Sequence, residues 1–339
     1  MIKTKGNLQI PENYNTGMSI RETEIAIKMI KDNLERELAD TLNLTRVSAP
    51  LFVDPSTGLN DNLNGIERPV TFDIKETGMD VQIVQSLAKW KRMALGEYNF
   101  RVGEGLYTDM NAIRRDEIAD NLHSIYVDQW DWERIIEDED RNIDFLKKIV
   151  NEIFHCLRRT QNYLLRIYPE LDGKLPEEIF FITSQELEDR YPDLAPRARE
   201  DEICREKKAV FVMQIGDLMQ SGIKHDGRAP DYDDWSLNGD IILWYPLLER
   251  AFEISSMGIR VDSKIMSAQL YKANCMERED LPFHRCVLEN SIPLSIGGGI
   301  GQSRICMYFL NKAHVGEVQT SVWPKEMSRE CREHGIMLL

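Results

Sequence analysis

A glycine cluster followed by an arginine is the stretch whose residue types most clearly allow chemistry. Glycines occupy 297–299 and 301 after a short apolar run, and an apolar helical pattern continues through 305–310. Such glycines let the backbone approach a ligand, and the start of a helix offers free N–H groups to an anion. Arg304 lies in the first turn of this predicted helix, where the helix dipole disfavours a cation. The pattern therefore predicts an anionic or π-rich partner, and we interpret this turn as one wall of a nucleotide site.

A run of alternating residues forms a second candidate. In HSIYVDQWDWE, at 123–133, Gln129 and Asp131 fall on one face of an extended chain, and Trp130 and Trp132 fall on the other. Successive side chains of a β-strand point to opposite faces of the sheet. We therefore predict a strand whose aromatic face packs into a core and whose polar face meets a ligand.

Two later segments, 240–244 and 251–261, also read as strands, and they carry polar groups. These groups are Asp240, Glu253, Ser255, Ser256 and Arg260. Taken alone, the two carboxylates could equally face solvent from strand edges, because ionised side chains are rarely buried without a partner.

Other polar residues have ordinary interpretations on composition alone. The Gly- and Asn-rich loop at 54–65, which holds Asp61, is typical of a surface turn. A helix is predicted to begin at Ser86, and we place its Lys89 and Arg92 on a solvated face. The acidic residues of DYDDW at 231–235 are likewise typical of a loop.

Amphipathic helices must position these candidates. Ser19 and Glu22 form a capping box at the start of a predicted helix that ends near Asn43 and leads into an extended segment with Pro50. This helix could pack in the core or form a dimer interface. A second long helix is predicted at 137–168. Together with the strands they indicate an α+β fold, an antiparallel sheet flanked by helices. We expect residues 1–18 to be an irregular lead-in and 19–339 to be a single domain.

The composition limits the function classes. With 339 residues and 29% charged residues the chain is typical of a globular protein, and its net charge of −15 argues against nucleic acid as the main ligand. The six cysteines contain no CxxC pair and indicate reduced thiols. No apolar run reaches the ~20 residues of a membrane span, and the first residues lack a signal-peptide core. We therefore expect a cytoplasmic protein without a membrane partner.

The order of these pieces resembles a known family. A long helix followed by the Pro50 segment, then Arg114 before the acidic strand, then GGGIGQSR with Arg304 resemble motifs 1, 2 and 3 of class II aminoacyl-tRNA synthetases. The resemblance is closer to the ammonia-dependent asparagine synthetases, the aspartate–ammonia ligases. The blocks that carry it are SLAKWKR, GEGLYT, YVDQWDWE, RAPDYDDW, FEISSMGIRV and GGGIGQSR. These six blocks in order extend from about the first helix to Trp323.

The resemblance implies a reaction and a set of roles. Enzymes of this family join L-aspartate and ATP into a β-aspartyl adenylate, which ammonia opens to asparagine with release of AMP and diphosphate. Arg114 would then bridge the reacting carboxylate and the α-phosphate, and Arg304 would contact the adenine or the triphosphate. Asp240 and Glu253 would hold Mg²⁺ against the phosphates, since magnesium prefers hard oxygen ligands.

The resemblance also assigns the remaining residues. For the amino acid it implies Asp131 and Asp233 near the α-ammonium, Lys91 at the α-carboxylate, Ser86 and Ser256 as hydrogen-bond donors, and Gln129 at the side-chain end. Asp61 would lie near the new amide and orient ammonium. For the nucleotide it implies Gln85, Tyr232, Ser255 and Arg260. Position 85 departs from the histidine common in the family, so a charged role there is in doubt.

Three functions remain to be compared. The leading hypothesis is an AMP-forming ligase that uses free ammonia, acts as a homodimer and needs no tRNA. The alternative is a synthetase paralogue that activates aspartate or another amino acid for transfer to tRNA or protein. A catalytically silent subunit is a third class, and the intact set of Arg114, Asp240, Glu253 and Arg304 argues against it.

Overall fold

An eight-stranded sheet forms the centre of the molecule in the computed structural model, which describes residues 2–61, 63 and 67–339. The pairs β3–β7 and β9–β10 are parallel, and the other neighbours are antiparallel. In spatial order the strands are β3 (Leu44–Arg46), β7 (Gly105–Ile113), β8 (Tyr126–Ile135), β13 (Ser295–Gly301), β12 (Arg250–Arg260), β11 (Asp233–Tyr245), β10 (Ala209–Met213) and β9 (Phe180–Thr183). The predicted α+β class with a mostly antiparallel sheet is confirmed.

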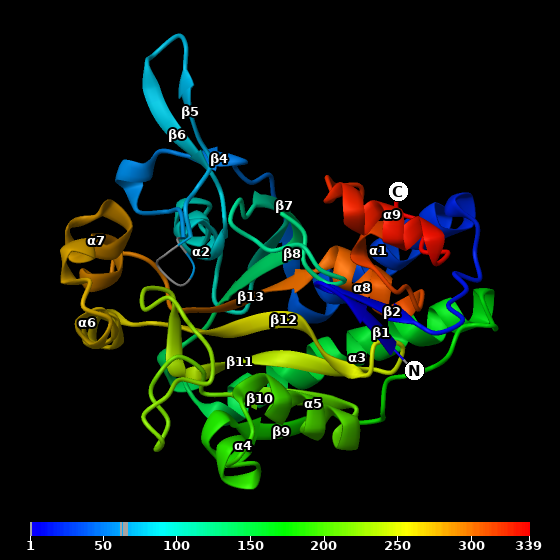
Figure 1. The fold of residues 1–339 in the computed structure, drawn as a ribbon. Helices are drawn as coiled ribbons and strands as arrows, with labels where there is room; N and C mark the ends of the chain where they lie inside the picture. Colours follow the sequence, from blue (N-terminus) through cyan, green and yellow to red (C-terminus); the bar gives the residue numbers. More distant parts are fainter. Residues whose placement is uncertain (1, 62, 64–66) are drawn as a thin grey trace.

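Helices cover this sheet (Figure 1). They are α1 (Ile20–Leu42), α2 (Ala88–Glu97), α3 (Ile143–Ile167), α4 (Ser184–Arg190), α5 (Pro196–Lys207), α6 (Ser263–Lys272), α7 (Pro282–Leu288), α8 (Gln302–Phe309) and α9 (Lys325–Glu333). Short 3₁₀ helices are η1 (Pro55–Thr57), η2 (Asp138–Asp140), η3 (Met276–Asp280) and η4 (Val315–Glu317). The predicted capping box of Ser19 and Glu22 starts α1, and Asn43 ends it in a left-handed conformation.

One face of the sheet lies in the main core. Apolar residues of α1, α3 and α8 form one buried cluster with Trp130 and Trp132 of β8. Gln129 and Asp131, which alternate with these tryptophans, point to the other face. The sheet therefore has an apolar face under three helices and a polar face that is available to a ligand, as the alternation predicted.

Two small sheets lie outside the central one. The pair β1 (Ile2–Lys5) and β2 (Leu8–Pro11) forms a hairpin, and β4 (Phe52–Val53), β6 (Met79–Ile83) and β5 (Thr71–Ile74) form a three-stranded sheet. In Figure 1 the β5–β6 hairpin projects from the body of the molecule. Its turn contains Gly78 with a positive φ of 66°, which glycine adopts without steric cost.

The structure corrects several local predictions. The lead-in at 1–18 is irregular only in part, because it contains β1 and β2, and β2 hydrogen-bonds to Asn121 through both the N–H and the carbonyl of Gln9, at 2.7 Å each; Met1 lies outside the described residues. The second long helix begins only at Ile143, because the side chain of Asn142 caps it, and the acidic residues before it form η2. Pro50 lies between β3 and β4 rather than in a strand, since proline lacks the N–H that a strand ladder needs.

The glycine cluster also differs from the prediction. Glycines 297–299 and 301 lie within β13, and only the residues after them form the helix α8. A Cβ atom on Gly299 would lie 2.5 Å from Gln129 Oε1 and 2.6 Å from Asp131 Oδ1. These glycines therefore make room for polar side chains of the neighbouring strand. None of the described helices combines the length and apolar character needed to cross a bilayer.

Candidate active site

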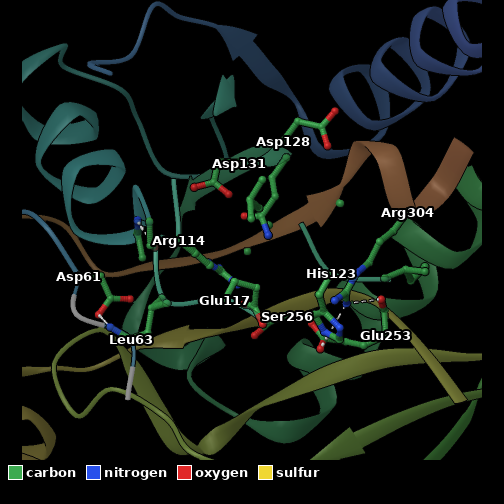
Figure 2. Close-up of a pocket in the computed structure, with 18 of the residues that line it drawn as sticks. Asp61, Leu63, Arg114, Glu117, His123, Asp128, Asp131, Glu253, Ser256 and Arg304 are labelled. Carbon is green, nitrogen blue, oxygen red and sulfur yellow. Dashed lines mark hydrogen bonds and ion pairs between the residues drawn. The ribbon is translucent and has the colours of Figure 1, made fainter. Parts of the chain in front are cut away.

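A cavity of about 400 Å³ opens over the polar face of the central sheet. Its floor comes from β8, β12 and β13, and its walls come from α2, α8 and three loops. The sequence-predicted residues that line it are Asp61, Ser86, Lys91, Arg114, Gln129, Asp131, Tyr232, Asp233, Glu253, Ser256, Arg260 and Arg304. Segments far apart in the sequence thus meet around one polar space (Figure 2).

One end of the cavity is built from paired charges. Lys91 Nζ donates to the carbonyl of Gly298 at 2.9 Å and lies 3.3 Å from Asp131 Oδ2 and 3.9 Å from Glu133 Oε2. Burial lowers the pKa of Lys91 below its ordinary value, although the two carboxylates oppose this shift. The sheet therefore holds the Lys91 ammonium group in place, and Asp131 lies beside it at the cavity.

Arg260 belongs to the same end. Its Nε and Nη2 donate to the two oxygens of Glu133 at 2.8 and 2.6 Å, and its Nη1 contacts Asp233. Ser295 Oγ donates to Glu133 at 2.7 Å. Arg260 is predicted for the nucleotide, yet it shares Glu133 with Lys91 and pairs with Asp233, and both of these residues are predicted for the amino acid. Its guanidinium carbon also lies 5.7 Å from the ring centre of Tyr232, which is predicted for the nucleotide.

The other end of the cavity is more open and holds less completely paired arginines. Arg304 lies in the first turn of α8, as predicted, and its Nη1 donates to the carbonyl of Glu253 at 2.8 Å. Arg114 follows β7 and lines the cavity, and its Nε is buried without a partner among the described residues. In Figure 2, Arg304, Glu253 and His123 lie on one side of the site, and Asp61 and Arg114 lie on the other. The open end thus offers cations to an anionic ligand.

Three predicted site residues do not line the cavity. Ser255 neighbours Ser256 on β12 and therefore points to the opposite face, where its hydroxyl is buried. Gln85 is buried before α2, and its side-chain amide has no partner within the described part of the chain. Asp240 lies behind the cavity wall in an ion pair with Arg228. The first two residues therefore have no contact that supports a nucleotide role.

The two carboxylates predicted to hold magnesium, Asp240 and Glu253, lie on the neighbouring strands β11 and β12. Burial and the nearby Glu253 carboxylate raise the pKa of Asp240 above its ordinary value, despite the opposing charge of Arg228. Such an accumulation of carboxylates on β11 and β12 suits a hard divalent cation. No described group of three or more histidine, cysteine or acidic side chains has the geometry of a metal site. These two carboxylates can therefore supply part of a coordination shell, with phosphate oxygens and water as further ligands.

Asp61 is not part of a solvated turn, contrary to what its loop composition indicated. The side chain is only 1% exposed, and its Oδ1 accepts from the N–H of Leu63 at 3.0 Å. Burial raises the pKa of Asp61 to about 6, and the charge of Lys89 opposes this increase. Part of the predicted 54–65 loop lies outside the described residues.

Lys89 and Arg92 do not lie on a solvated helix face, so that prediction is wrong. Both are 3% exposed. Lys89 Nζ lies 3.0 Å from Asp231 Oδ2, and Arg92 donates to the carbonyls of Pro293 and Val261 at 2.9 and 2.7 Å. Their partners are far away in the sequence, so the helix itself carries no signal of burial.

Other residues of the cavity were missed. Arg228 and His123 line it, and His123 Nδ1 lies 2.9 Å from Asp120 Oδ1. Asp231 and Asp234 were read as ordinary loop residues, yet both are buried, with ion pairs to Lys89 and Arg141 respectively. Arg228, at the start of the acidic block RAPDYDDW, is a sequence signal that this loop contains paired charges.

Comparisons with known proteins agree with this geometry. A model of the aspartate–ammonia ligase family matches residues 21–335. A protein of Ruminiclostridium cellulolyticum named aspartate–ammonia ligase is 63% identical, over 97% of this chain and 98% of its own length. One of the same name from Clostridium tetani is 61% identical, over 100% of this chain and 99% of its own length.

Solved structures share the fold at much lower identity. Asparaginyl-tRNA synthetase from Pyrococcus horikoshii, complexed with asparaginyl-adenylate, superposes with a TM-score of 0.65 at 15% identity, over 90% of this chain and 71% of that chain. The Entamoeba histolytica asparaginyl-tRNA synthetase gives a TM-score of 0.62 at 11% identity, over 88% of this chain and 66% of that chain. The fold is that of the class II aminoacyl-tRNA synthetases, and the chain belongs to the aspartate–ammonia ligase family.

Proposed function

We propose that this chain is an AMP-forming ligase that converts L-aspartate, ammonia and ATP to L-asparagine, AMP and diphosphate. The observation that carries the proposal is the division of one cavity into two ends. One end has buried, mutually paired charges around Lys91, Asp131 and Asp233, and the other presents Arg114 and Arg304. A zwitterionic amino acid suits the first end and a polyanionic nucleotide suits the second.

Aspartate binds at the paired end. Asp131 and Asp233 lie where they can accept from its α-ammonium, and Lys91 supplies a cation for its α-carboxylate. Ser86 and Ser256 line the same cavity and can donate hydrogen bonds, and Gln129 extends from the sheet floor beside Asp131. This arrangement holds the amino acid so that its β-carboxylate extends toward the nucleotide.

Activation then requires two anions to meet. Arg114 presents a guanidinium to the cavity from the open end, where it stabilises charge that develops on the α-phosphate as the β-carboxylate attacks. A planar guanidinium can contact a carboxylate and a phosphate together, which an ammonium cannot. Arg304 contacts the nucleotide at the open end, and Tyr232, which lines the same cavity, is a further predicted nucleotide contact. Magnesium, when held by Glu253 and Asp240, would neutralise phosphate charge.

Ammonia completes the reaction beside Asp61. Ammonium has no lone pair, so it must lose a proton before it attacks the adenylate carbonyl. Asp61 lines the cavity and keeps Oδ2 without a partner within the described part of the chain, so this carboxylate oxygen is available to orient ammonium and accept its proton.

The predicted homodimer, the cytoplasmic location and the absence of a tRNA partner stay predictions. Light scattering of the purified protein tests the first, since a dimer has twice the 39.4 kDa mass of this chain. Adding tRNA to the assay below tests the last, and we expect no change in rate.

The reaction itself is tested by incubating the protein with L-aspartate, ATP, MgCl₂ and ammonium chloride. We expect asparagine and AMP in equal amounts. Formation of ADP, or activity that requires tRNA, would contradict the proposal. Aspartate-dependent exchange of labelled diphosphate into ATP, measured without ammonia, isolates the first half of the reaction.

A further inference from the structure

A cluster of charges around the buried Asp231 lies on the elements that support the Asp61 loop, and it has no role in the proposed reaction. Three donors converge on one oxygen, Oδ2 of Asp231, each at 3.0 Å. They are Lys89 Nζ, Arg278 Nη1 and His284 Nε2. Asp231 is 0% exposed, and Lys89 is 3% exposed. The lysine, the arginine and the histidine come from α2, η3 and α7, so this carboxylate joins three separate elements at one point.

The loop that carries Asp61 is fixed against the same elements. Asn60 Oδ1 accepts from the backbone N–H of Asp61 and from that of Gln85, both at 3.0 Å, which joins the loop to the chain entering α2. A Cβ atom on Gly58 would lie 2.9 Å from Leu281 Cβ and 3.3 Å from His284 Nδ1. The loop therefore packs directly on the segment that begins α7. Asp61 and the Asp231 cluster consequently share a rigid support.

The two carboxylates of this region differ in how they are satisfied. Asp231 receives three cationic or polar donors, which hold its pKa well below the ordinary value although burial acts in the opposite direction. Asp61 receives only the N–H of Leu63, on Oδ1, and its buried Oδ2 has no partner among residues 2–61, 63 and 67–339. The cations of the cluster are thus anchored by Asp231, while Oδ2 of Asp61 faces the cavity with no partner among the residues that the structure describes.

We propose that Lys89 is a positioning residue for Asp61, held by Asp231 so that Asp61 presents a charged and uncommitted oxygen to the nitrogen nucleophile. This inference rests on the proposed function. In the second half of the reaction ammonium gives one proton to Asp61, and the ammonia formed attacks the β-carbonyl carbon. A C–N bond forms, the C–O bond to AMP breaks, AMP leaves with the electron pair, and the nitrogen loses its second proton to water.

The charges that face Asp61 explain why Lys89 is needed. Burial raises the pKa of Asp61, and Asp231 raises it further, whereas Lys89 and, more weakly, Arg114 lower it. Arg278 and Tyr232 also interact electrostatically with Asp61, from η3 and from the residue before β11. Lys89 is the strongest of the opposing charges. Without it, more of Asp61 would be protonated near neutral pH and unable to accept a proton.

The test compares the two half-reactions in Lys89→Gln. We expect aspartate-dependent diphosphate exchange to stay within about threefold of the unsubstituted protein, while kcat/KM for ammonium falls about 100-fold, the scale of general base catalysis. The acid limb of the pH profile for asparagine synthesis should move to higher pH. Hydroxylamine, which is largely unprotonated at neutral pH, should retain most of its rate as nucleophile.

Two further variants complete the design. Lys174→Gln removes a half-buried lysine, which donates to the carbonyl of Tyr308 away from the cavity, and should leave both half-reactions unchanged. In an Asp61→Asn background, Lys89→Gln should cause no additional loss, because the two residues act as one unit. Equal losses in exchange and synthesis with an unshifted pH profile, or losses that multiply in the double variant, would overturn the inference. Absence of exchange in the unsubstituted protein would instead contradict the proposed function.

Discussion

The two ends of the cavity differ in how completely their charged side chains are paired. At the amino-acid end the side chains of Lys91 and Arg260 are each 2% exposed, and both are matched by carboxylates of the sheet. At the nucleotide end Arg304 forms a looser ion pair with Glu253, at 3.6 Å, and the two side chains are 22% and 46% exposed. Arg114 has no carboxylate within ion-pair distance among the described residues. One end is electrostatically complete before a ligand arrives, and the other is completed by the ligand.

This difference follows from the ligands that we propose. At this end aspartate presents one positive group, its α-ammonium, and one negative group, its α-carboxylate, while its β-carboxylate extends toward the nucleotide, so a site with paired charges can exchange partners without leaving a buried ion alone. A triphosphate brings only negative charge, so cations that are already neutralised would bind it poorly. Catalytic effects should therefore dominate at the open end, and stability effects should dominate at the paired end.

The largest expected effect is at Arg114. Arg114→Ala should lower aspartate-dependent diphosphate exchange by several orders of magnitude, because the Arg114 charge stabilises the approach of the β-carboxylate to the α-phosphate. The free energy of unfolding should change by about 0.5 kcal/mol or less. The matched control is the exposed neighbour Arg115, and Arg115→Ala should keep normal exchange. Near-normal exchange in Arg114→Ala would contradict the claim that catalytic effects dominate at the open end.

The next effect is on stability at the paired end. Glu133→Gln keeps the side-chain shape but leaves Arg260 with a single remaining carboxylate, Asp233, and should lower the free energy of unfolding by about 3 kcal/mol. Urea denaturation followed by circular dichroism measures this loss. Arg114→Ala is the comparison, and a larger destabilisation in that variant than in Glu133→Gln would contradict the account.

A smaller effect is expected at Glu253. Glu253→Gln removes a charged oxygen ligand and should raise the magnesium concentration for half-maximal exchange about tenfold, equivalent to about 1.4 kcal/mol. Titration of MgCl₂ at saturating ATP and aspartate provides the measurement. Glu249→Gln, at an exposed position before β12, is the control and should titrate normally. An unchanged magnesium requirement in Glu253→Gln would remove this residue from the proposed coordination.

Local signals predicted the sheet floor well. The capping box at Ser19, the alternation that separates Gln129 from Trp130, and the place of Arg304 in a first helical turn each depend on neighbours in the sequence. The resemblance of the six blocks to the aspartate–ammonia ligases then indicated the family and the fold, and the comparisons confirm both.

The walls were less predictable because their partners are distant. Lys89 on α2 is paired with a residue 142 positions away, and the burial of Asp61 depends on the packing of its loop against α7. The β1–β2 hairpin is held by Asn121, which no local pattern connects to it. A charged residue on a helix or loop can face solvent or pair with a distant carboxylate, and the local sequence does not distinguish the two cases. The corrections therefore concentrate in loops and in charged residues of α2.

Transfer of oxygen between the two ends tests the central claim most directly. Aspartate labelled with ¹⁸O in its β-carboxylate would be incubated with ATP, MgCl₂ and ammonium, and the products would be analysed by mass spectrometry. A β-aspartyl adenylate formed across this cavity predicts one labelled oxygen in the phosphate of AMP for each asparagine made. Label in inorganic phosphate with ADP as the nucleotide product, or AMP without label, would contradict the account.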